Sequence, residues 1–435
     1  MLRFFFDIIC VYLRLIHWKF SISSYIKIMK QIHTENRSRR KFVEKAGFGL
    51  ASLALVPKFN FLKASHAENK VRVGIIGGRF GASFQFHEHP NCIVEAVSDL
   101  RTDRRENLMK VYQCSKSYPS LEELIKDPKI DAVFIATPAP DHVKHVLAAL
   151  NAGKHVLSAV PAALNLDECF QLKEAVVKSG LIYMMAETSY FRQNTISVRK
   201  LYQENSFGEI FSAAAEYNHP GLETLWFEDK KPTWRHGLPP MLYPTHCTSF
   251  LISVTGERLT SVSALGYGDQ SPLLKNNPYN NPFWNETAFF QTLKNHPFRV
   301  EVNWKGALRN AERAEWRGEK MSFISSPTES NEHTIIRSVE TMGKDDAGFQ
   351  IKENRIEKYV QEKWWKTPLL PEALRHDSGH DGSHSFITHE FIESIVQKRA
   401  SKINVFEALA YTVPGIIAHA SALKNGEYMK IPNFD

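Results

Sequence analysis

The sequence predicts an α/β protein in which a doubly wound parallel sheet precedes an α+β domain built on an open, mostly antiparallel sheet. Three observations lead to this fold class. The 435-residue chain is long enough for two domains. From 71 to about 190, short apolar runs alternate with helical patterns, as βαβ units require. Beyond 190, strand-like runs follow one another more often.

The first predicted strand begins at Val71, ends in the glycine-rich stretch 77–81, and is followed by a helical pattern. Such a turn brings backbone N–H groups against a pyrophosphate at the positive end of a helix. A G-x-G-x-x-G motif starting at Gly77 would have Arg79 and Ala82 in its later glycine positions, and one starting at Ile76 lacks the first glycine. A plain strand-to-helix turn therefore remains an alternative.

The second predicted strand, Ile93 to Asp99, ends in a carboxylate about 20 residues after the glycine turn. An acid at this spacing can hydrogen-bond a ribose hydroxyl, so the two features together predict a dinucleotide-binding Rossmann domain. Asp99 favours NAD because a carboxylate repels a 2′-phosphate. Arg101 and Arg104 lie close enough in sequence to keep NADP as the alternative.

The other elements of the first domain continue the alternation. Ser120 can cap the short helix that it opens, and Gly153 should end the helix before it. The predicted helices cover 104–112, 120–125, 141–152 and 166–179, and the predicted strands cover 130–138, 154–157 and 181–185. We place the first domain at 68–190.

The second domain, 191–435, shows a different pattern. A long loop rich in Trp and Pro covers 219–240, and the region 306–380 is polar without a clear element. Pro414 should kink the last helix or mark its start. Helices are predicted at 192–204, near 244, 385–397 and 405–424, and strands at 208–217, 259–265, 287–293 and 299–304. We expect the C-terminal helices to return toward the first domain.

The formal net charge of +7 comes from the N-terminal segment. Residues 1–67 hold 12 Lys and Arg against 3 Asp and Glu, which leaves 42 against 44 in the remainder. We therefore expect no nucleic-acid partner. The five cysteines are widely spaced and fit small buried side chains, although export would permit a bridge between Cys92 and Cys114.

The segment Ser38-Arg-Arg-Lys-Phe-Val-Glu-Lys45 resembles a twin-arginine export signal. An apolar run, 46–56, and the small residues of Ser65-His-Ala67 follow in the expected order. This predicts a periplasmic protein, attached to a membrane only if the signal stays uncleaved. The apolar stretch that precedes Met29 is too short and too charged to span a membrane. Translation is expected to begin at Met29, which would leave this stretch out of the protein.

Several motifs follow one another in an order that is typical of one protein family. They are the glycine turn, Asp99, Ala136-Thr-Pro138 before His142, Ala152-Gly-Lys-His-Val156, and a proline six residues after His155. From 71 to 435 the chain resembles the Gfo/Idh/MocA family of NAD(P)-dependent oxidoreductases. The resemblance implies a small carbohydrate substrate and a homo-oligomer formed through the open sheet. It assigns cofactor binding to Gly77, Gly78, Arg79, Phe80, Gly81, Asp99, Thr137, Pro138, His142 and Pro161.

Two departures affect the chemistry that the family implies. The Glu-Lys-Pro triplet is Ala159-Val-Pro161, and valine cannot exchange a proton with a sugar hydroxyl. The Asp-x-x-x-His motif is Leu242-Tyr-Pro-Thr-His246, which keeps only the histidine. The chain is also similar to NAD-dependent α-N-acetylgalactosaminidases at Val160-Pro-Ala-Ala163, Tyr217-Asn-His219 and Tyr243-Pro-Thr-His246.

In those glycosidases a tightly held NAD oxidises a ring hydroxyl, which acidifies a neighbouring C–H so that the glycosidic group can leave. The resemblance implies His246 and Tyr217 as acid/base groups and His219 and Tyr243 as substrate-binding or assisting groups. Core packing or helix capping is the alternative role for these side chains. A less complete glycine cluster and Ala159 also leave room for another exported branch.

A cluster of histidines and aspartates and a group of aromatic residues each have two possible roles. Three histidines and two aspartates in 376–384 could bind a metal if they were helical, but two glycines favour a polar active-site lip, and we assign no metal. The aromatic residues of 226–234 and Phe283-Trp284 could stack on sugar rings or form core and interface surface.

Three functions remain after these arguments. The main expectation is an exported NAD(P)-binding oxidoreductase acting on a carbohydrate, which would reduce added cofactor. The alternative is a redox-neutral glycosidase, which would cleave glycosides without accumulating NADH. A sugar- or partner-binding protein without catalysis is the third.

Overall fold

The computed structural model describes residues 70–309, 311–328 and 332–435. The twin-arginine segment, its cleavage site and Met29 lie outside these residues. The stretch Ala67–Asp435 forms one compact unit. Among the helices of the described part, none combines the length and the apolar character needed to cross a membrane.

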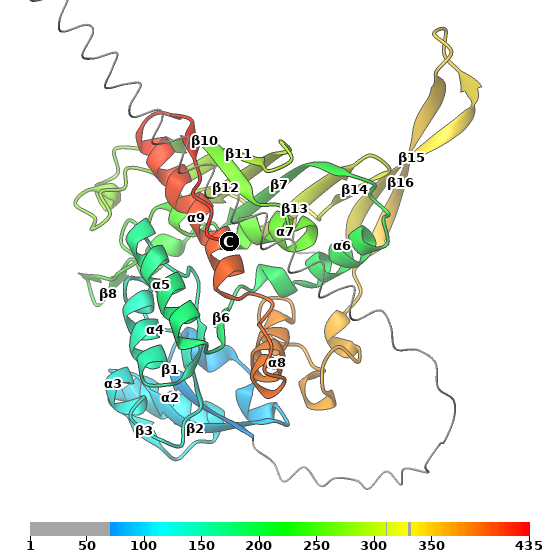
Figure 1. Cartoon of the computed structure of the whole chain (residues 1–435). Helices are drawn as coiled ribbons and strands as arrows, with labels where there is room; N and C mark the ends of the chain where they lie inside the picture. The colour runs from blue at the N-terminus through cyan, green and yellow to red at the C-terminus, as the bar shows by residue number, and fades with distance from the viewer. Residues whose placement is uncertain (1–69, 310, 329–331) are drawn as a thin grey trace, which may run out of the picture. The chain divides into compact units, whose positions relative to one another are not determined.

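The first sheet has six parallel strands in the order β3-β2-β1-β4-β5-β6 (Figure 1). This is the strand order of a doubly wound dinucleotide-binding sheet, so the predicted Rossmann fold is confirmed. The strands are β1 (Val71–Ile76), β2 (Cys92–Ser98), β3 (Ser117–Tyr118), β4 (Ala132–Ile135), β5 (His155–Ser158) and β6 (Tyr183–Met185). The helices are α2 (Thr102–Tyr112), α3 (Leu121–Leu124), α4 (His142–Asn151) and α5 (Leu166–Ser179).

Local sequence signals explain these elements. All four residues of β4 are buried, as expected for a strand covered on both faces. At α5 the Asn165 side chain accepts a hydrogen bond from the Glu168 N–H at 2.9 Å, and Gly180 ends the helix in the left-handed conformation. The predicted Ser120 cap is present, since its Oγ accepts from the Glu123 N–H at 3.4 Å.

The helix expected after the glycine turn is absent from the described structure, which has two short 3₁₀ turns there, η1 (Phe80–Ser83) and η2 (Phe86–Glu88). Phe84 and Phe86 are 1% and 0% exposed, and the Phe84 ring lies 4.7 Å from that of Phe134 in β4. An α-helix would direct side chains two residues apart to different sides. Burial of both rings in the core therefore favours the irregular backbone.

The second sheet has nine strands in the order β16-β15-β14-β13-β7-β12-β11-β10-β17. Only the β7–β12 pair is parallel, so the expectation of a mostly antiparallel sheet is confirmed. Its strands are β7 (Ile210–Asn218), β10 (Leu259–Tyr267), β11 (Asn285–Thr292), β12 (Pro297–Asn303), β13 (Ala311–Gly318), β14 (Met321–Ile324), β15 (Glu332–Lys344), β16 (Gln350–Val360) and β17 (Met429–Lys430). A separate hairpin joins β8 (Phe227–Glu228) to β9 (Lys231–Pro232).

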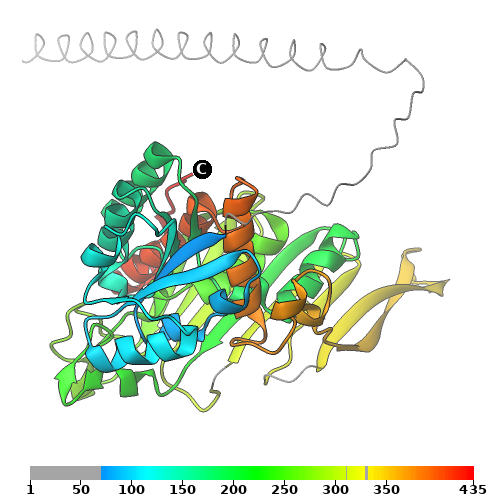
Figure 2. The same ribbon diagram turned by 90° about the horizontal axis from the view of Figure 1, so that it is seen from below.

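Four strands, β13 to β16, lie in the polar region whose sequence showed no clear element. The β15–β16 hairpin projects from the body of the molecule in both views (Figures 1 and 2). Most of β16 is exposed, including Ile356 and Val360, each 70% exposed. Because neither face of this ribbon is fully buried, its sequence lacks the regular apolar alternation by which strands are recognised.

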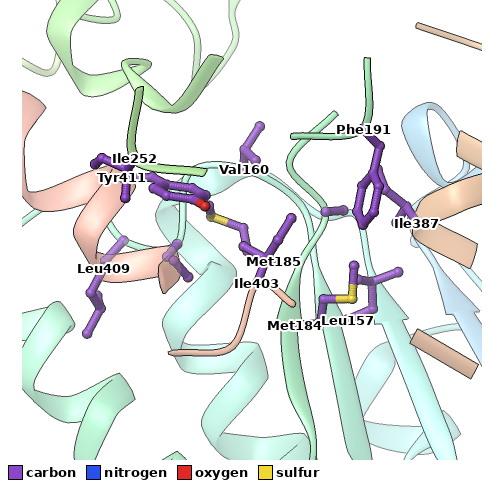
Figure 3. Close-up of a cluster of buried hydrophobic side chains, with 14 of the residues drawn as sticks. Leu157, Val160, Met184, Met185, Phe191, Ile252, Ile387, Ile403, Leu409 and Tyr411 are labelled. Carbon is purple, nitrogen blue, oxygen red and sulfur yellow. The ribbon is translucent and has the colours of Figure 1, made fainter. Parts of the chain in front are cut away.

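The helices of the second half are α6 (Gln193–Gln203), α7 (Thr245–Thr255), α8 (Ser383–Val396) and α9 (Val405–Leu423). Helix α9 packs on α5 and β6, and the Ser401 hydroxyl donates to the Tyr183 carbonyl at 2.8 Å. Figure 3 shows the cluster at this junction, where Met184 and Met185 lie near Ile403. Pro414 lies inside α9, which begins at its Asn404 cap.

The four described cysteines, 92, 114, 169 and 247, are buried free thiols, as their spacing predicted.

Candidate active site

A cavity of about 820 Å³ lies at the carboxyl ends of β1, β2 and β4. Gly77 has a φ of +102°, and a Cβ there would lie 2.3 Å from the Ala136 carbonyl oxygen. Only glycine therefore suits this turn. The predicted cofactor residues that line the cavity are Gly77, Gly78, Arg79, Phe80, Asp99, Thr137 and Pro138.

Three predicted cofactor residues, Gly81, His142 and Pro161, do not line this cavity. Gly81 packs against the core, where an added Cβ would meet Ala136 and Ile75 at 3.4 Å. His142 is 1% exposed, with Nδ1 2.8 Å from the Pro161 carbonyl oxygen and Nε2 2.9 Å from that of Thr137. His142 therefore links the turn at Thr137 to the turn at Pro161, and its side chain does not line the cavity.

His145 lines the cavity although the sequence did not single it out. Its Nδ1 lies 2.9 Å from the Thr137 hydroxyl. It follows His142 by three residues on α4, so one helical turn separates the supporting histidine from the one that lines the cavity.

Asp99 is engaged by the backbone of both neighbouring turns. Its Oδ2 accepts from the Gly78 N–H at 2.7 Å, and its Oδ1 accepts from the Arg101 N–H at 2.8 Å. A carboxylate oxygen has more than one acceptor position, so Asp99 can still bind a ribose hydroxyl. It also shapes the glycine turn, a role that the sequence did not predict.

Three arginines converge on Glu228 of the β8–β9 hairpin at the edge of the same cavity. Glu228 Oε1 accepts from Arg79 at 2.9 Å, from Arg101 at 3.0 Å and from Arg104 at 2.9 Å. These pairs connect the hairpin to the Rossmann sheet across the cavity rim. Arg79 and Arg101 come from the turns after β1 and β2, and Arg104 lies in the first turn of α2. The phosphate and ribose groups of a dinucleotide bind at this edge of such a sheet.

The residues of this cavity fit a dinucleotide. The glycine that a side chain would block, the acid after β2 and a cavity of sufficient volume are all present. The described residues form no long helix at the glycine turn, so Arg79, Arg101 and Arg104 would supply the positive charge for the phosphates of a bound dinucleotide.

Val160 stands where the resemblance places a lysine, and it is 6% exposed. Figure 3 shows it among apolar side chains with Met185 and Tyr411. No proton can be transferred at this position, so acid/base groups must come from elsewhere.

A second cavity, of about 510 Å³, lies beside β7 and β13 and is lined by Tyr217, His219, Glu312 and His380, among others. Tyr217 brings the four predicted catalytic residues together. Its ring centroid lies 4.8 Å from that of His246, 5.9 Å from that of Tyr243 and 5.9 Å from that of His219. The sequence placed these residues on two separate segments, 217–219 and 243–246.

Both phenols are weak acids in this environment. Burial raises the pKa of Tyr217 well above its usual value, and the neighbouring Tyr243 and Glu312 raise it further. Burial likewise raises the pKa of Tyr243 to about 12, although Arg235 opposes the rise. Both hydroxyls are therefore protonated near neutral pH and can donate a hydrogen bond or a proton.

His246, 4% exposed at the start of α7, has a carboxylate partner. Its Nδ1 lies 2.8 Å from Oε1 of Glu187, which lies two residues after the end of β6. Burial alone would lower the pKa of His246, but Glu187 and Glu312 outweigh this effect and raise the pKa above its usual value. His246 is thus a stronger base than an isolated imidazole.

Glu312 on β13 connects this pair to a cation. It accepts from Arg192 Nε at 2.8 Å and from the Ser189 hydroxyl at 2.6 Å. Burial alone would raise the pKa of Glu312, yet Arg192 and His246 hold the pKa well below its usual value. Glu312 is therefore an anion at the wall of the second cavity.

The sequence did not single out Glu187, Glu312 or Arg192. A carboxylate two residues after a buried parallel strand was a usable signal for Glu187, because such positions lie at the ligand-binding edge of the sheet. Glu312 lies in the polar region 306–380, where no local pattern marked a strand. Its place beside Arg192 depends on the pairing of β13 with β7.

The three histidines of 376–384 do not gather into one site. His376 Nε2 pairs with Glu88. His384 donates through Nδ1 to the Ser83 carbonyl at 2.8 Å, and its ring stacks on Phe84 at 4.3 Å. His380 Nδ1 lies 2.7 Å from Nε2 of His384. His380 also lines the second cavity, and the sequence predicted a polar lip for this segment.

One other group has metal-ligand residue types within the described chain: His89, His389 and Glu393. His89 Nδ1 accepts the Asn91 N–H at 3.1 Å, which leaves the imidazole proton on Nε2. That nitrogen faces His389 Nδ1 at 3.0 Å and donates to it. A nitrogen that carries a proton has no lone pair for a metal, so the contact is a hydrogen bond between two neutral rings.

The aromatic residues considered for sugar stacking separate into two roles. Trp226 and Trp284 stack on each other at 5.0 Å and are 0% and 4% exposed, so they form core. Trp234 lines the first cavity and stacks with Arg235 at 4.2 Å.

Comparison with known proteins gives matches in both halves of the chain. A model of the Gfo/Idh/MocA oxidoreductase family with an NAD-binding Rossmann fold matches residues 71–187, and a model of the glycosyl hydrolase 109 C-terminal domain matches residues 333–435. A glycosyl hydrolase family 109 protein of Solibacter usitatus is 24% identical over 408 residues, covering 84% of this chain and 88% of that protein.

Two solved structures share the fold. Scyllo-inositol dehydrogenase from Lactobacillus casei, with bound NAD(H) and scyllo-inositol, has a TM-score of 0.62 and 17% identity over 83% of this chain and 99% of its own. Levoglucosan dehydrogenase, in complex with NADH and levoglucosan, has a TM-score of 0.67 and 18% identity over 84% of this chain and 100% of its own.

Proposed function

Since the chain combines a Rossmann domain of the Gfo/Idh/MocA oxidoreductase family with a glycosyl hydrolase 109 C-terminal domain, we propose that it is an NAD-dependent glycosidase without net oxidation of its substrate. This function was the alternative to the oxidoreductase that the sequence favoured. The family 109 relative, similar over 84% of this chain, moves it to first place.

The observation that carries the proposal is the set of proton-transfer groups. Val160 offers none, whereas two phenols and a carboxylate-paired imidazole lie together near the second cavity. A dehydrogenase must remove one hydroxyl proton, but an elimination must also take a proton from carbon and return one. Several groups with different pKa values suit the second task.

The first cavity would hold NAD, whose chemistry when bound is to take the hydride of a ring carbinol carbon and to return it after bond cleavage. The proton of that hydroxyl passes to solvent in the oxidation and is taken back when the hydride returns. The chain supplies a base for the acidified C–H, and the broken C1–O bond gives its electron pair to the leaving oxygen. His246 is the proposed base and Tyr217 the proposed acid for that oxygen. Water then adds to C1, and the carbon proton is replaced from solvent.

His219 and Tyr243 are the proposed substrate-binding groups. His219 lines the second cavity, and its Nδ1 is buried and accepts no hydrogen bond from the described residues. A sugar hydroxyl donating to this nitrogen would satisfy it. A carbohydrate is therefore the proposed substrate class, and Asp99 favours NAD over NADP as the cofactor.

The test uses the full chain, loaded with NAD, and aryl α- and β-glycosides in D₂O, beginning with an α-N-acetylgalactosaminide. We expect release of the aryl alcohol, no accumulation of NADH, and one deuterium on the ring carbon that lost its proton. Aryl release without deuterium would contradict elimination. Reduction of NAD in proportion to product would favour the second candidate, a sugar dehydrogenase.

The retained cofactor has its own measurement. A redox-neutral cycle needs no exchange of NAD, and the Glu228 pairs close one edge of the cavity. We expect denatured protein to release close to one nucleotide per chain, identified by absorbance and mass. Absence of nucleotide together with no binding on titration would point to a sugar- or partner-binding protein.

A further inference from the structure

The hydrogen bonds around His246 fix its tautomer. Its Nδ1 faces two acceptors, Glu187 Oε1 at 2.8 Å and the Ser189 hydroxyl oxygen at 3.3 Å. Ser189 must give its proton to Glu312, because a carboxylate only accepts. His246 therefore carries a proton on Nδ1, and Nε2 is the nitrogen that gains or loses a proton.

Glu187 is held so that one oxygen serves the imidazole. Its side chain is 0% exposed, and Oε1 accepts from the Ser189 N–H at 2.8 Å as well as from His246. Its Oε2 is buried and receives no hydrogen bond from the described residues. A buried carboxylate with an unpaired oxygen is costly, so Glu187 depends on the hydrogen bond from His246 for its stabilisation.

The groups that face His246 come from every element packed around it. Glu187 and Glu312 are anionic, Arg192 is cationic, and His380 lies across the cavity lining. Tyr217 and Tyr243 cover the ring with neutral phenols, 4.8 and 5.1 Å away between centroids. Glu187 is the one carboxylate that bonds the imidazole directly.

We propose that Glu187 is the positioning residue of His246, holding the proton on Nδ1 and leaving Nε2 as the basic nitrogen for the reaction. This inference rests on the proposed function for its catalytic meaning. Leu242, four residues before His246, offers no carboxylate, and the carboxylate that pairs with His246 belongs to Glu187, two residues after β6 of the other sheet. A residue that follows the last strand of the Rossmann sheet thereby fixes which nitrogen of His246, in the second domain, carries the proton.

The chain contains a matched control. Glu286 on β11 is 1% exposed, and its Oε1 lies 2.8 Å from Nδ1 of His419, as in the Glu187–His246 pair. Its other oxygen accepts from the Met241 N–H at 2.7 Å. Glu286→Gln therefore breaks an equally buried pair without removing the partner of His246.

The experiment is ¹⁵N NMR of histidine-labelled full chain, with His246 assigned from the spectrum of His246→Asn. We expect Nδ1–H in the wild type, and we expect Glu187→Gln to lower the pKa of His246 by about one unit or more. The acidic limb of kcat/KM for the glycoside should move down in pH by the same amount. Glu286→Gln should leave both unchanged.

Each outcome has a distinct meaning. A wild-type His246 with its proton on Nε2 would overturn the proposal even if Glu187→Gln fails to fold. An unchanged pKa and pH profile in folded, active Glu187→Gln would overturn the positioning role alone. Expected spectra without cleavage of any glycoside would overturn the proposed function and leave the tautomer assignment in place.

Discussion

Tyr217 shows how one side chain can matter for chemistry more than for stability. Its hydroxyl makes no hydrogen bond to another described residue, yet its ring contacts three other predicted catalytic side chains. We expect Tyr217→Phe to change the free energy of unfolding by less than about 1 kcal/mol. Glycoside cleavage should fall about 10²- to 10⁴-fold, chiefly in kcat.

Urea unfolding and initial-rate kinetics measure these two effects. Tyr428→Phe, at an exposed tyrosine near the C-terminus, is the control and should alter neither quantity. Retention of full activity by Tyr217→Phe would remove this phenol from the mechanism.

His89 should make the protein sensitive to acid. It is 2% exposed, and burial together with His389 lowers its pKa from 6.5 to about 3. The unfolded chain therefore binds this proton first, so the stabilisation is complete above pH 6.5 and is lost as the pH falls toward 3. The loss between pH 7 and pH 5 amounts to about 2 kcal/mol.

Urea unfolding at pH 7 and pH 5 tests this dependence. His89→Gln should flatten this part of the pH profile, whereas His87→Gln, at an exposed neighbour, should retain it. An equal slope in the wild type and His89→Gln would assign the acid sensitivity to other groups.

At the scale of elements, the turn after β1 decides whether a nucleotide can bind. A Cβ at Gly77 would lie 2.3 Å from a backbone oxygen of Ala136, whereas one at Gly153 would meet nothing within 4 Å. Both glycines have positive φ, so each alanine variant bears the same kind of backbone strain, about 1 kcal/mol. Only Gly77→Ala must also displace the end of β4.

We therefore expect Gly77→Ala to weaken NAD binding more than tenfold and to lower the melting temperature more than Gly153→Ala does. Fluorescence titration with NAD and calorimetry measure the two effects. Equal nucleotide affinity in both variants would mean that the turn is not part of the binding site.

At the scale of the whole molecule, no described residue covers the face of the nine-stranded sheet at β10 and β11. Leu265 on β10 and Phe289 on β11 are 63% and 60% exposed there, and they lie on adjacent antiparallel strands. An apolar group of this kind marks a contact surface. We propose, in line with the expected homo-oligomer, that a second copy of the chain covers this face.

Light scattering after size-exclusion chromatography should give a mass above that of one 49.7 kDa chain. Leu265→Glu with Phe289→Glu should give monomers. Phe170→Glu, at an exposed phenylalanine on α5, should leave the assembly intact. A monomeric wild type at micromolar concentration would contradict the proposal.

Export remains a proposal, because residues 1–67 lie outside the described structure. If Arg39 and Arg40 direct the twin-arginine route, replacing both by lysine should retain the protein in the cytoplasm. Arg37→Lys should not. Immunoblots of cell fractions distinguish the outcomes, and periplasmic protein in the double variant would exclude this route.

The sequence by itself determined the Rossmann sheet and most of its cavity. Strands such as β4 are buried on both faces and carry continuous apolar residues, and Gly77 and Asp99 lie at the strand ends that meet at one edge. The local sequence was sufficient there because the residue pattern of each strand shows which of its faces are buried. The four predicted catalytic residues, which came from family resemblance, lie close together in the structure, and their catalytic role stays a prediction.

Only the tertiary structure decided the rest. The turn after Gly77 is irregular because Phe84 and Phe86 both enter the core, and β15 and β16 escaped recognition because most of their residues are exposed. Glu187 and Glu312 lie 125 positions apart in the chain and meet at Ser189 because β6 ends near the β7–β13 pair. Such a meeting depends on how segments that belong to two different sheets come together in space, which no local pattern of residues encodes.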